Sequence, residues 1–236
     1  MYKKVLLKLS GEVLSGEGQK GFNLDNISYL IKELKQILEY GTNVGIVIGA
    51  GNLFRGREMS ELSPTIADQI GMLGTVINAL YLKDIFEKNG IRTVIVSQVT
   101  SLPSIRPIHY DDINLYFDAG YLVIFAGGTS NPFFTTDTAA ALRAVEMKAE
   151  ILIKGTKVPG VFDKDPKIYD DAKKYEKLTF DEAIEKNLKI MDTEAFSICK
   201  RYNMHIMVLD FFEKGNLLKA ITGENVGTLV VPGDSK

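Results

Sequence analysis

The chain has 236 residues, of which 45% are hydrophobic and 25% charged, and its net charge is -2. This length suits one compact domain with a large buried core. The near-neutral charge lacks the cationic field that non-specific nucleic-acid binding needs, so we expect no primary nucleic-acid role. A single cysteine, Cys199, excludes an intrachain disulfide, and with two histidines it leaves no Cys/His zinc cage.

The amino-terminal residues 1–10 contain a short apolar run that Lys8 interrupts, which is not the pattern of a signal peptide. No stretch approaches the roughly 20 apolar residues that span a bilayer. We therefore expect a cytoplasmic protein with no membrane partner.

Seven short apolar runs rich in β-branched residues predict buried strands. In chain order they are residues 5–9, 44–48, 93–96, 121–125, 151–153, 206–209 and 228–231.

Segments with helical periodicity separate most of the strands. They include residues 27–38 and a long helix that Pro64 can begin and Asn89-Gly90 can end. Thr179 and Glu182 form a capping-box pattern before a further helix, and the polar segment 163–177 ahead of it predicts a surface loop. Strands that alternate with helices predict a mostly parallel sheet covered on both faces, with ligands bound beyond the carboxyl ends of the strands.

Two glycine-rich loops follow the first two strands, in the sequences KLSGE at 8–12 and GAGNLFRG at 49–56. Glycine lets the backbone approach an anion closely, and Lys8 or Arg55 would supply positive charge, so together the loops predict a phosphate site. Neither loop is a Walker A or dinucleotide motif. Each one alone is equally consistent with a tight turn from strand to helix.

The fourth and fifth strands are also followed by polar loops. Residues 126–140 place threonines and Asp137 before an alanine-rich helix, which a simple helix cap would also explain. The segment Asn131-Pro-Phe-Phe134 favours instead a pocket for a flat base and a ribose. In residues 154–166, Thr156 could hold a nucleoside while Phe162 packs against adenine; the alternative is a charged surface turn.

Two aspartates near helix starts have local explanations as well. Asp68, early in the long helix, would complement the helix dipole, and Gly71, Gly74 and Asn78 after it form a stripe of small residues that permits close approach. Asp192 fits a helix cap first and a supporting active-site role second.

The four strand-end motifs resemble those of the bacterial uridylate kinases, a branch of the amino acid kinase superfamily, and the resemblance extends over about residues 4–231. It implies a single domain, residues 1–236, folded as a three-layer α/β/α sandwich. The amino-terminal part would mainly bind UMP and form oligomer contacts, and the carboxyl-terminal part would mainly bind ATP. The implied reaction transfers the γ-phosphoryl group of ATP to UMP, giving UDP for pyrimidine nucleotide biosynthesis, with Mg²⁺ held by nucleotide phosphates and water.

The resemblance also assigns roles to residues of this chain. Lys8 and Arg55 would neutralise the transferring group, while Asp137 would orient Lys8 or a magnesium-bound water. The implied ATP site consists of Lys8, Leu9, Ser10, Gly11, Gly51, Arg55, Thr156, Phe162 and Asp165. The implied UMP site consists of Ala50, Asp68, Thr129, Ser130, Asn131, Pro132, Phe133, Phe134, Thr135 and Thr136.

The family is typically hexameric, inhibited by UTP and activated by GTP. The sequence departs from the family pattern at Ala50 and Pro159, in sites formed mainly by backbone. It also carries Lys83 and Glu87 where some relatives have an arginine and a histidine linked to GTP, which leaves GTP only a possible effector.

The long helix independently suggests oligomer contacts, because it is apolar on more than one face. Met72, Val76 and Tyr81 lie outside the stripe formed by residues 66, 70, 73, 77 and 80. A sheet covers only one face of a helix, so a second chain is expected to cover the other.

Two other functions remain open. One is a kinase of the same fold that acts on a carboxylate or carbamate such as acetylglutamate, against which Phe133, Phe134 and Asp68 argue. The other is a catalytically silent nucleotide-binding protein, against which the combination of Lys8 and Asp137 argues.

Overall fold

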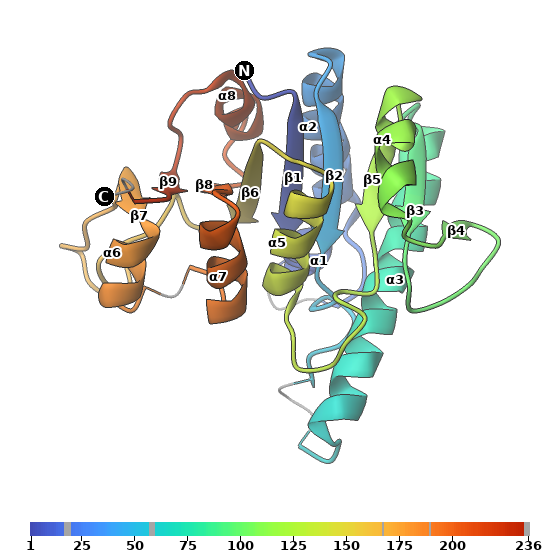
Figure 1. The fold of residues 1–236 in the computed structure, drawn as a ribbon, viewed down its shortest axis with the longest axis horizontal. Helices are drawn as coiled ribbons and strands as arrows, with labels where there is room; N and C mark the ends of the chain where they lie inside the picture. The colour runs from blue at the N-terminus through green and yellow to red at the C-terminus, as the bar shows by residue number, and fades with distance from the viewer. Residues whose placement is uncertain (17–19, 57–59, 167, 189, 234–236) are drawn as a thin grey trace.

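A computed structural model describes residues 1–16, 20–56, 60–166, 168–188 and 190–233, and these form one nine-stranded sheet with helices on both faces (Figure 1). The strand order is β4-β3-β5-β2-β1-β6-β8-β9-β7. The bounds are β1 Lys4–Leu9, β2 Asn43–Ile48, β3 Thr93–Val96, β4 Ile105–Arg106, β5 Leu122–Phe125, β6 Ile151–Thr156, β7 Lys177–Thr179, β8 His205–Asp210 and β9 Thr228–Val231. Neighbouring strands are parallel except for the antiparallel pair β8 and β9.

The helices form an outer layer on each face of the sheet, which confirms the expected α/β/α sandwich (Figure 1). Helices α1, α2, α3 and α8 pack on one face, and α4, α5, α6 and α7 pack on the other. Their bounds are α1 Glu12–Ser15, α2 Leu24–Glu39, α3 Pro64–Lys88, α4 Tyr110–Asp118, α5 Thr136–Glu146, α6 Phe180–Glu185, α7 Thr193–Arg201 and α8 Asn216–Thr222.

All seven predicted strands are present, but no apolar run predicted the further strands β4 and β7. These two lie at opposite edges of the sheet and have two and three residues. Each depends on backbone pairing with one neighbour, β3 or β9, rather than on an apolar run of its own. The polar segment 163–177 follows β6 and ends at the first residue of β7, and its Lys174 forms an antiparallel backbone bridge with Phe162.

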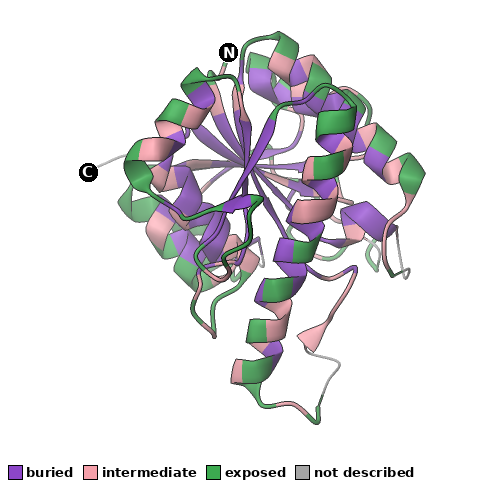
Figure 2. Cartoon of the chain, turned by 90° about the vertical axis from the view of Figure 1, so that its right-hand side faces the viewer, coloured by how far each residue is buried: buried purple, intermediate pink, exposed green. Residues whose placement is uncertain are grey.

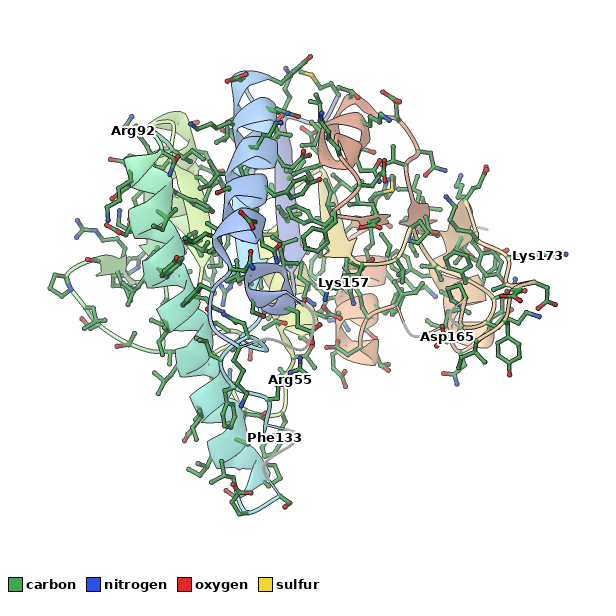
Figure 3. The ribbon with its side chains drawn as sticks, turned by 180° about the vertical axis from the view of Figure 1, so that it is seen from behind. Arg55, Arg92, Phe133, Lys157, Asp165 and Lys173 are labelled. Atoms are coloured by element: carbon green, nitrogen blue, oxygen red, sulfur yellow. The ribbon has the colours of Figure 1, made fainter. Side chains whose placement is uncertain are left out.

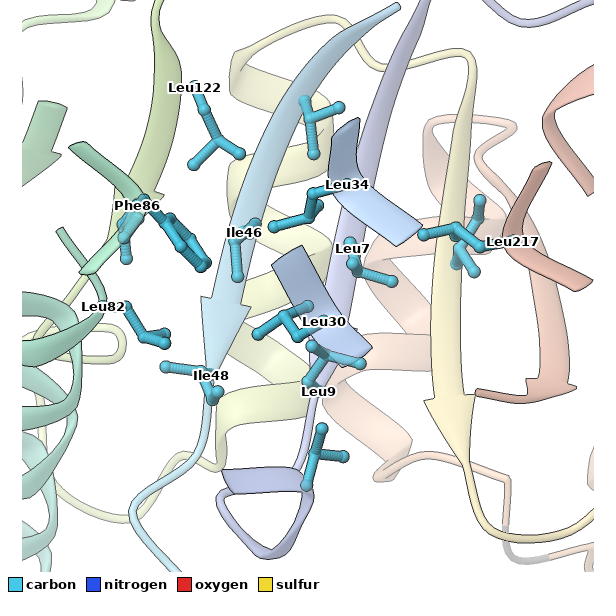
Figure 4. Close-up of a cluster of buried hydrophobic side chains, with 14 of the residues drawn as sticks. Leu7, Leu9, Leu30, Leu34, Ile46, Ile48, Leu82, Phe86, Leu122 and Leu217 are labelled. Atoms are coloured by element: carbon cyan, nitrogen blue, oxygen red, sulfur yellow. The ribbon is translucent and has the colours of Figure 1, made fainter. Parts of the chain in front are cut away.

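The core consists of two apolar layers, one on each face of the sheet. Leu7 and Leu9 of β1 pack in the layer that contains Leu30 and Leu34 of α2 (Figure 4), whereas Leu6 belongs to the opposite layer. Central parallel strands are therefore buried on both faces, which explains why their sequences are continuously apolar rather than alternating.

Helix α3 buries one apolar face and exposes the other, and its amino-terminal half extends beyond the sheet (Figure 2). Met72 and Val76 are buried, whereas Ile66, Leu73 and Ile77 are 45%, 48% and 53% exposed. The periodicity could not decide between these faces because both are apolar. In the described part of the chain, no helix is long and apolar enough to span a membrane.

Candidate active site

The carboxyl ends of β5, β2, β1 and β6 are neighbours at one edge of the sheet, so the four predicted loops converge there as expected. The strand register places Lys8 of β1 directly beside Lys154 of β6. Two buried or half-buried ammonium groups side by side require a compensating negative charge.

Asp137, in the first turn of α5, supplies that charge. Its Oδ1 pairs with the Lys8 Nζ, and its Oδ2 accepts a hydrogen bond from the Lys154 Nζ at 2.8 Å. Lys154 also donates to the carbonyl of Ile190. The expected contact between Lys8 and Asp137 is therefore present. No role was predicted for Lys154, although a lysine at the end of a buried strand is a usable signal.

The electrostatics of this triad follow from its burial. Burial alone would raise the pKa of Asp137, but the ammonium groups of Lys8 and Lys154 outweigh that effect and lower it below its ordinary value. The pKa of Lys154 is lowered by its burial and by the charge of Lys8, against the attraction of Asp137. The carboxylate is therefore ionised and committed to orienting two lysines.

The prediction that Asp192 caps a helix is confirmed, and its side chain has further contacts. It is the N-cap of α7, where its Oδ1 accepts a hydrogen bond from the Ala195 amide at 2.7 Å. It also accepts hydrogen bonds from the hydroxyls of Thr135 and Thr138. The Asp192 side chain therefore ties α7 to the start of α5, beside Asp137.

The two glycine-rich loops pack against each other through bare backbone. A Cβ atom on Gly11 would lie 2.6 Å from the Gly51 amide nitrogen and 2.7 Å from the Gly49 oxygen. A Cβ on Gly74 of α3 would lie 2.8 Å from the Cβ of Ala50. Glycine at positions 11 and 74 is therefore required by close approach. The prediction made for the small-residue stripe is confirmed at Gly74 but not at Gly71, where an added Cβ would meet nothing within 4 Å.

Arg55 and Lys157 lie at the outer side of these loops, and Figure 3 shows them near each other. The Arg55 Nη2 donates to the Glu12 Oε1 at 2.8 Å, and the Lys157 Nζ lies 3.7 Å from the Glu12 Oε2. Glu12 thus joins the loops after β1, β2 and β6. No role was predicted for Glu12, although it lies in the first glycine-rich loop motif.

A cavity of about 610 Å³ opens between α3 and the loop after β5. Seven residues of the expected UMP site line it, namely Ala50, Asp68, Thr129, Phe133, Phe134, Thr135 and Thr136. Ser130, Asn131 and Pro132 belong to the same loop but are not part of the lining.

The loop after β5 is held by Asp68, whose Oδ2 accepts a hydrogen bond from the Phe133 amide at 2.7 Å. Ser130 and Phe133 have φ angles of 69° and 71°, in the left-handed region that side chains other than glycine rarely adopt. Phe133 lines the cavity and is 73% exposed, and Figure 3 shows it beside the amino-terminal half of α3. Asp68 therefore does more than complement a helix dipole, because it fixes a strained backbone.

A second cavity, of about 650 Å³, is lined by Lys8, Asp137, Lys154 and residues of α6 and α7. It shares Thr135 and Thr136 with the first cavity, so the two meet at the amino-terminal end of α5, beside the lysine-aspartate triad. Two adjacent cavities with a charged junction fit a transfer reaction between two ligands.

Of the nine expected ATP residues, all of which lie in the described part of the chain, only Lys8 lines this second cavity. Leu9, Ser10, Gly11, Gly51 and Arg55 lie on or next to the two glycine-rich loops. The Thr156 hydroxyl donates to the carbonyl of Val158 at 2.7 Å. Phe162 pairs with Lys174, and Asp165 lies away from Arg55 (Figure 3).

Comparison with known proteins places the chain in a family. The model of the amino acid kinase family matches residues 3–210. The chain belongs to the amino acid kinase family. It is 84% identical over 232 residues to a uridylate kinase of Thermosipho melanesiensis, with 98% of this chain and all of the relative covered. A uridylate kinase of Fervidobacterium nodosum is 79% identical, with 98% of this chain and 99% of the relative covered.

Solved structures agree with the sequence relatives. A UMP kinase from Bacillus anthracis superposes with a TM-score of 0.95 at 35% identity and covers 99% of this chain and 97% of its own. A UMP kinase from Ureaplasma parvum gives 0.92 at 30% identity, with 98% and 99% covered. The chain therefore belongs to the uridylate kinase branch of the family, which confirms the resemblance seen in its motifs.

Lys83 and Glu87, which depart from the pattern of some uridylate kinases, form an ion pair on α3. The Lys83 Nζ also donates to the carbonyl of Thr93 at 2.7 Å. The lysine is therefore engaged within its own subunit, between α3 and β3.

Proposed function

We propose that this member of the uridylate kinases transfers the γ-phosphoryl group of ATP to UMP, producing ADP and UDP for pyrimidine nucleotide biosynthesis. The observation that carries the proposal is the pair of cavities that share Thr135 and Thr136 beside the Lys8–Asp137–Lys154 triad. UMP would occupy the cavity between α3 and the loop after β5, and the phosphates of ATP would approach from the triad and the glycine-rich loops.

The mechanism requires positioning and charge neutralisation more than covalent chemistry. The phosphate of UMP is already an anionic nucleophile, so no general base is needed. Lys8 and Arg55 would neutralise the transferring group, and the amides of Gly11 and Gly51 would act as preorganised donors. Asp137 would stay ionised and hold Lys8 and Lys154 at their positions, since its oxygens contact both lysines.

Magnesium is proposed to arrive with ATP, held mainly by phosphate oxygens and water, as is usual for this ion. The donor set at the junction fits that arrangement, because both oxygens of Asp137 are already paired with lysines and those of Asp192 with hydroxyls and an amide. Bound Mg²⁺ would add positive charge at the phosphates.

The proposal is tested with purified protein, ATP, magnesium and a panel of acceptors, with ADP release as the measurement. UMP is expected to be the preferred acceptor. CMP presents an amino donor where UMP has a carbonyl, and a site that binds one edge with buried polar groups discriminates strongly against the other. Faster turnover of CMP would contradict the choice of base.

The same panel decides between the alternatives. Faster turnover of acetylglutamate than of UMP would identify a kinase for a carboxylate. Binding of ATP without turnover of any acceptor would identify a silent nucleotide-binding protein. The exposed Phe133 and Phe134 at the cavity rim favour a flat base as the occupant.

We further propose that residues 1–236 act as one domain in the cytoplasm, with UMP binding and oligomer contacts mainly in the amino-terminal part and ATP binding mainly in the carboxyl-terminal part. The exposed apolar face of α3 supports a homo-oligomer, for which the family pattern suggests a hexamer. UTP would inhibit as a product-like nucleotide. GTP is a weaker effector candidate, because Lys83 is engaged with Glu87 and Thr93.

A further inference from the structure

Helix α3 carries polar side chains on its buried face, next to the second glycine-rich loop. Asn78 is fully buried, and so is Asn52 of the loop itself, while Thr75 is 3% exposed. Burying an amide without hydrogen bonds is costly, so each of these groups needs partners within the protein.

Asn52 and Asn78 satisfy each other in a reciprocal pair. The Asn52 Nδ2 donates to the Asn78 Oδ1 at 3.0 Å, and the Asn78 Nδ2 donates to the Asn52 Oδ1 at 2.8 Å. Each nitrogen also donates to a backbone carbonyl, Asn78 to Gly49 at 2.9 Å and Asn52 to Gly21 at 3.0 Å. Both side-chain nitrogens therefore use both of their hydrogens.

This amide pair lies directly behind the backbone proposed to bind phosphates. A Cβ on Gly11 would lie 2.5 Å from the Asn52 Oδ1 and 2.6 Å from the Gly51 amide nitrogen. Asn52 thus touches the loop after β1, while Asn78 holds the loop after β2 through Gly49. A shift of the pair would move the amides of both loops together.

The same helix holds the acceptor loop one turn earlier. The Thr75 hydroxyl accepts a hydrogen bond from the Gly127 amide at 2.8 Å and donates to the Met72 carbonyl at 2.7 Å. Thr75 and Asn78 therefore connect one rigid helix to the loops after β5 and β2. Helix α3 sets the distance between the loop proposed for UMP and the loops proposed for the ATP phosphates.

We propose that Asn52 and Asn78 are positioning residues for phosphoryl transfer, which fix the Gly11 and Gly51 amides relative to the acceptor loop. The inference rests on the proposed function of those amides. Leucine branches at Cγ as asparagine does, but it is bulkier and cannot make these hydrogen bonds. A pair that only filled space would keep kcat in a folded leucine variant. A pair that sets loop geometry would not.

The test uses Asn78→Leu, Asn52→Leu and the double variant in the full-length protein. Each is assayed for kcat and for KM of ATP and UMP at a temperature well below its own unfolding midpoint. We expect kcat to fall by about 10- to 100-fold in each single variant, because a small misplacement of donors is costly in the transition state. The double variant should lose no more than the worse single one, since the pair acts as a unit. Thr75→Val is the comparison on the same helix, and it should mainly raise KM for UMP.

A folded Asn78→Leu with wild-type kcat would overturn the proposal, and so would fully additive losses in the double variant. If Asn78→Leu does not fold, Asn78→Asp keeps the shape and the oxygen that accepts from the Asn52 Nδ2, but it loses the hydrogen bonds donated to the Gly49 carbonyl and to the Asn52 Oδ1. The same fall in kcat is expected. The wild-type protein is first tested with the acceptor panel. A wild type that does not phosphorylate UMP contradicts the proposed function. The positioning role is judged separately, because the variants are compared with the wild type on the best acceptor found.

Discussion

Lys8 interrupts the apolar run of β1 and yet is only 8% exposed, so its charge needs the partner that Asp137 provides. The sequence could show that a lysine stood at a strand end. It could not show that Lys154, far along the chain, shares the same carboxylate. That contact exists because β1 and β6 are neighbours in the sheet.

Lys8→Ala is expected to lower kcat by about 10²-fold or more, since a preorganised charge at the transferring group contributes several kcal/mol to the transition state. Steady-state kinetics with ATP and UMP measure the loss, and thermal unfolding checks the fold. Lys88→Ala, which removes an exposed lysine from the end of α3, is the matched control. A folded Lys8→Ala with near wild-type turnover would place Lys8 outside the reaction.

Glu33 is a fully buried residue of α2 to which the proposed reaction assigns no role. Burial raises its pKa above the ordinary value of 4.5, more than the Gly215 amide and the charge of Lys32 lower it. A carboxyl with a raised pKa binds its proton more tightly in the folded protein. Its contribution to stability is therefore greatest below pH 4.5 and is lost as the pH rises through the folded pKa.

Glu33→Gln removes this titration and is expected to raise the free energy of unfolding near neutral pH by about 1 to 3 kcal/mol, the usual cost of a poorly satisfied buried group. At a pH below 4.5, the ordinary pKa of the Glu33 carboxyl group, the variant and the wild type should have the same free energy of unfolding. Urea unfolding at the two pH values is the measurement, with Glu39→Gln on the exposed side of the same helix as control. If Glu33→Gln does not raise the free energy of unfolding at neutral pH, the charge of Glu33 is fully compensated by its surroundings.

Helix α3 contains two glycines, Gly71 and Gly74, that differ in whether their surroundings leave room for a side chain. Helix propensity alone favours alanine over glycine by about 1 kcal/mol at either position. Gly71 has nothing within 4 Å of an added Cβ, whereas at Gly74 that atom would meet Ala50 at 2.8 Å. Only Gly74 is therefore constrained by packing, and its neighbour is the phosphate loop.

Gly71→Ala is expected to stabilise the protein by roughly 0.5 to 1 kcal/mol, and Gly74→Ala to destabilise it through overpacking by about 1 to 3 kcal/mol. Denaturant unfolding of the two variants side by side measures both effects, and each serves as the control for the other. Equal stabilisation by both would show that Ala50 moves away without cost.

At the scale of the whole molecule, the exposed face of α3 is the feature that one subunit leaves unexplained. Ile66, Leu73 and Ile77 form an apolar surface on a helix whose other face already packs on the sheet. A second copy of the chain is the proposed cover.

Light scattering of the wild type is expected to give a multiple of 26.2 kDa, six-fold for a hexamer. Ile77→Glu should lower the mass, because it places a charge in the proposed interface. Leu115→Glu, a matched change of an exposed leucine on α4, should leave the mass unchanged. A monomeric wild type at micromolar concentration would remove the interface, and an unchanged rate at saturating UTP would remove the proposed inhibition.

The sequence was enough to predict the alternation of strands and helices, the sheet class and the four polar loops at strand ends. These features are local, because apolar runs, capping residues and glycine-rich turns act over a few neighbouring residues. It also carried the family motifs, which the comparisons bear out.

Three further features follow from the fold alone. These are the two lysines that share Asp137, the face of α3 that meets the sheet, and the pairing of Asn52 with Asn78 behind the phosphate loops. Each of these depends on segments that are distant in the chain and become neighbours only through the strand order. The short edge strands β4 and β7 also depend on the fold. Each is stabilised by pairing with a neighbouring strand, and this pairing leaves no pattern in the strand's own residues.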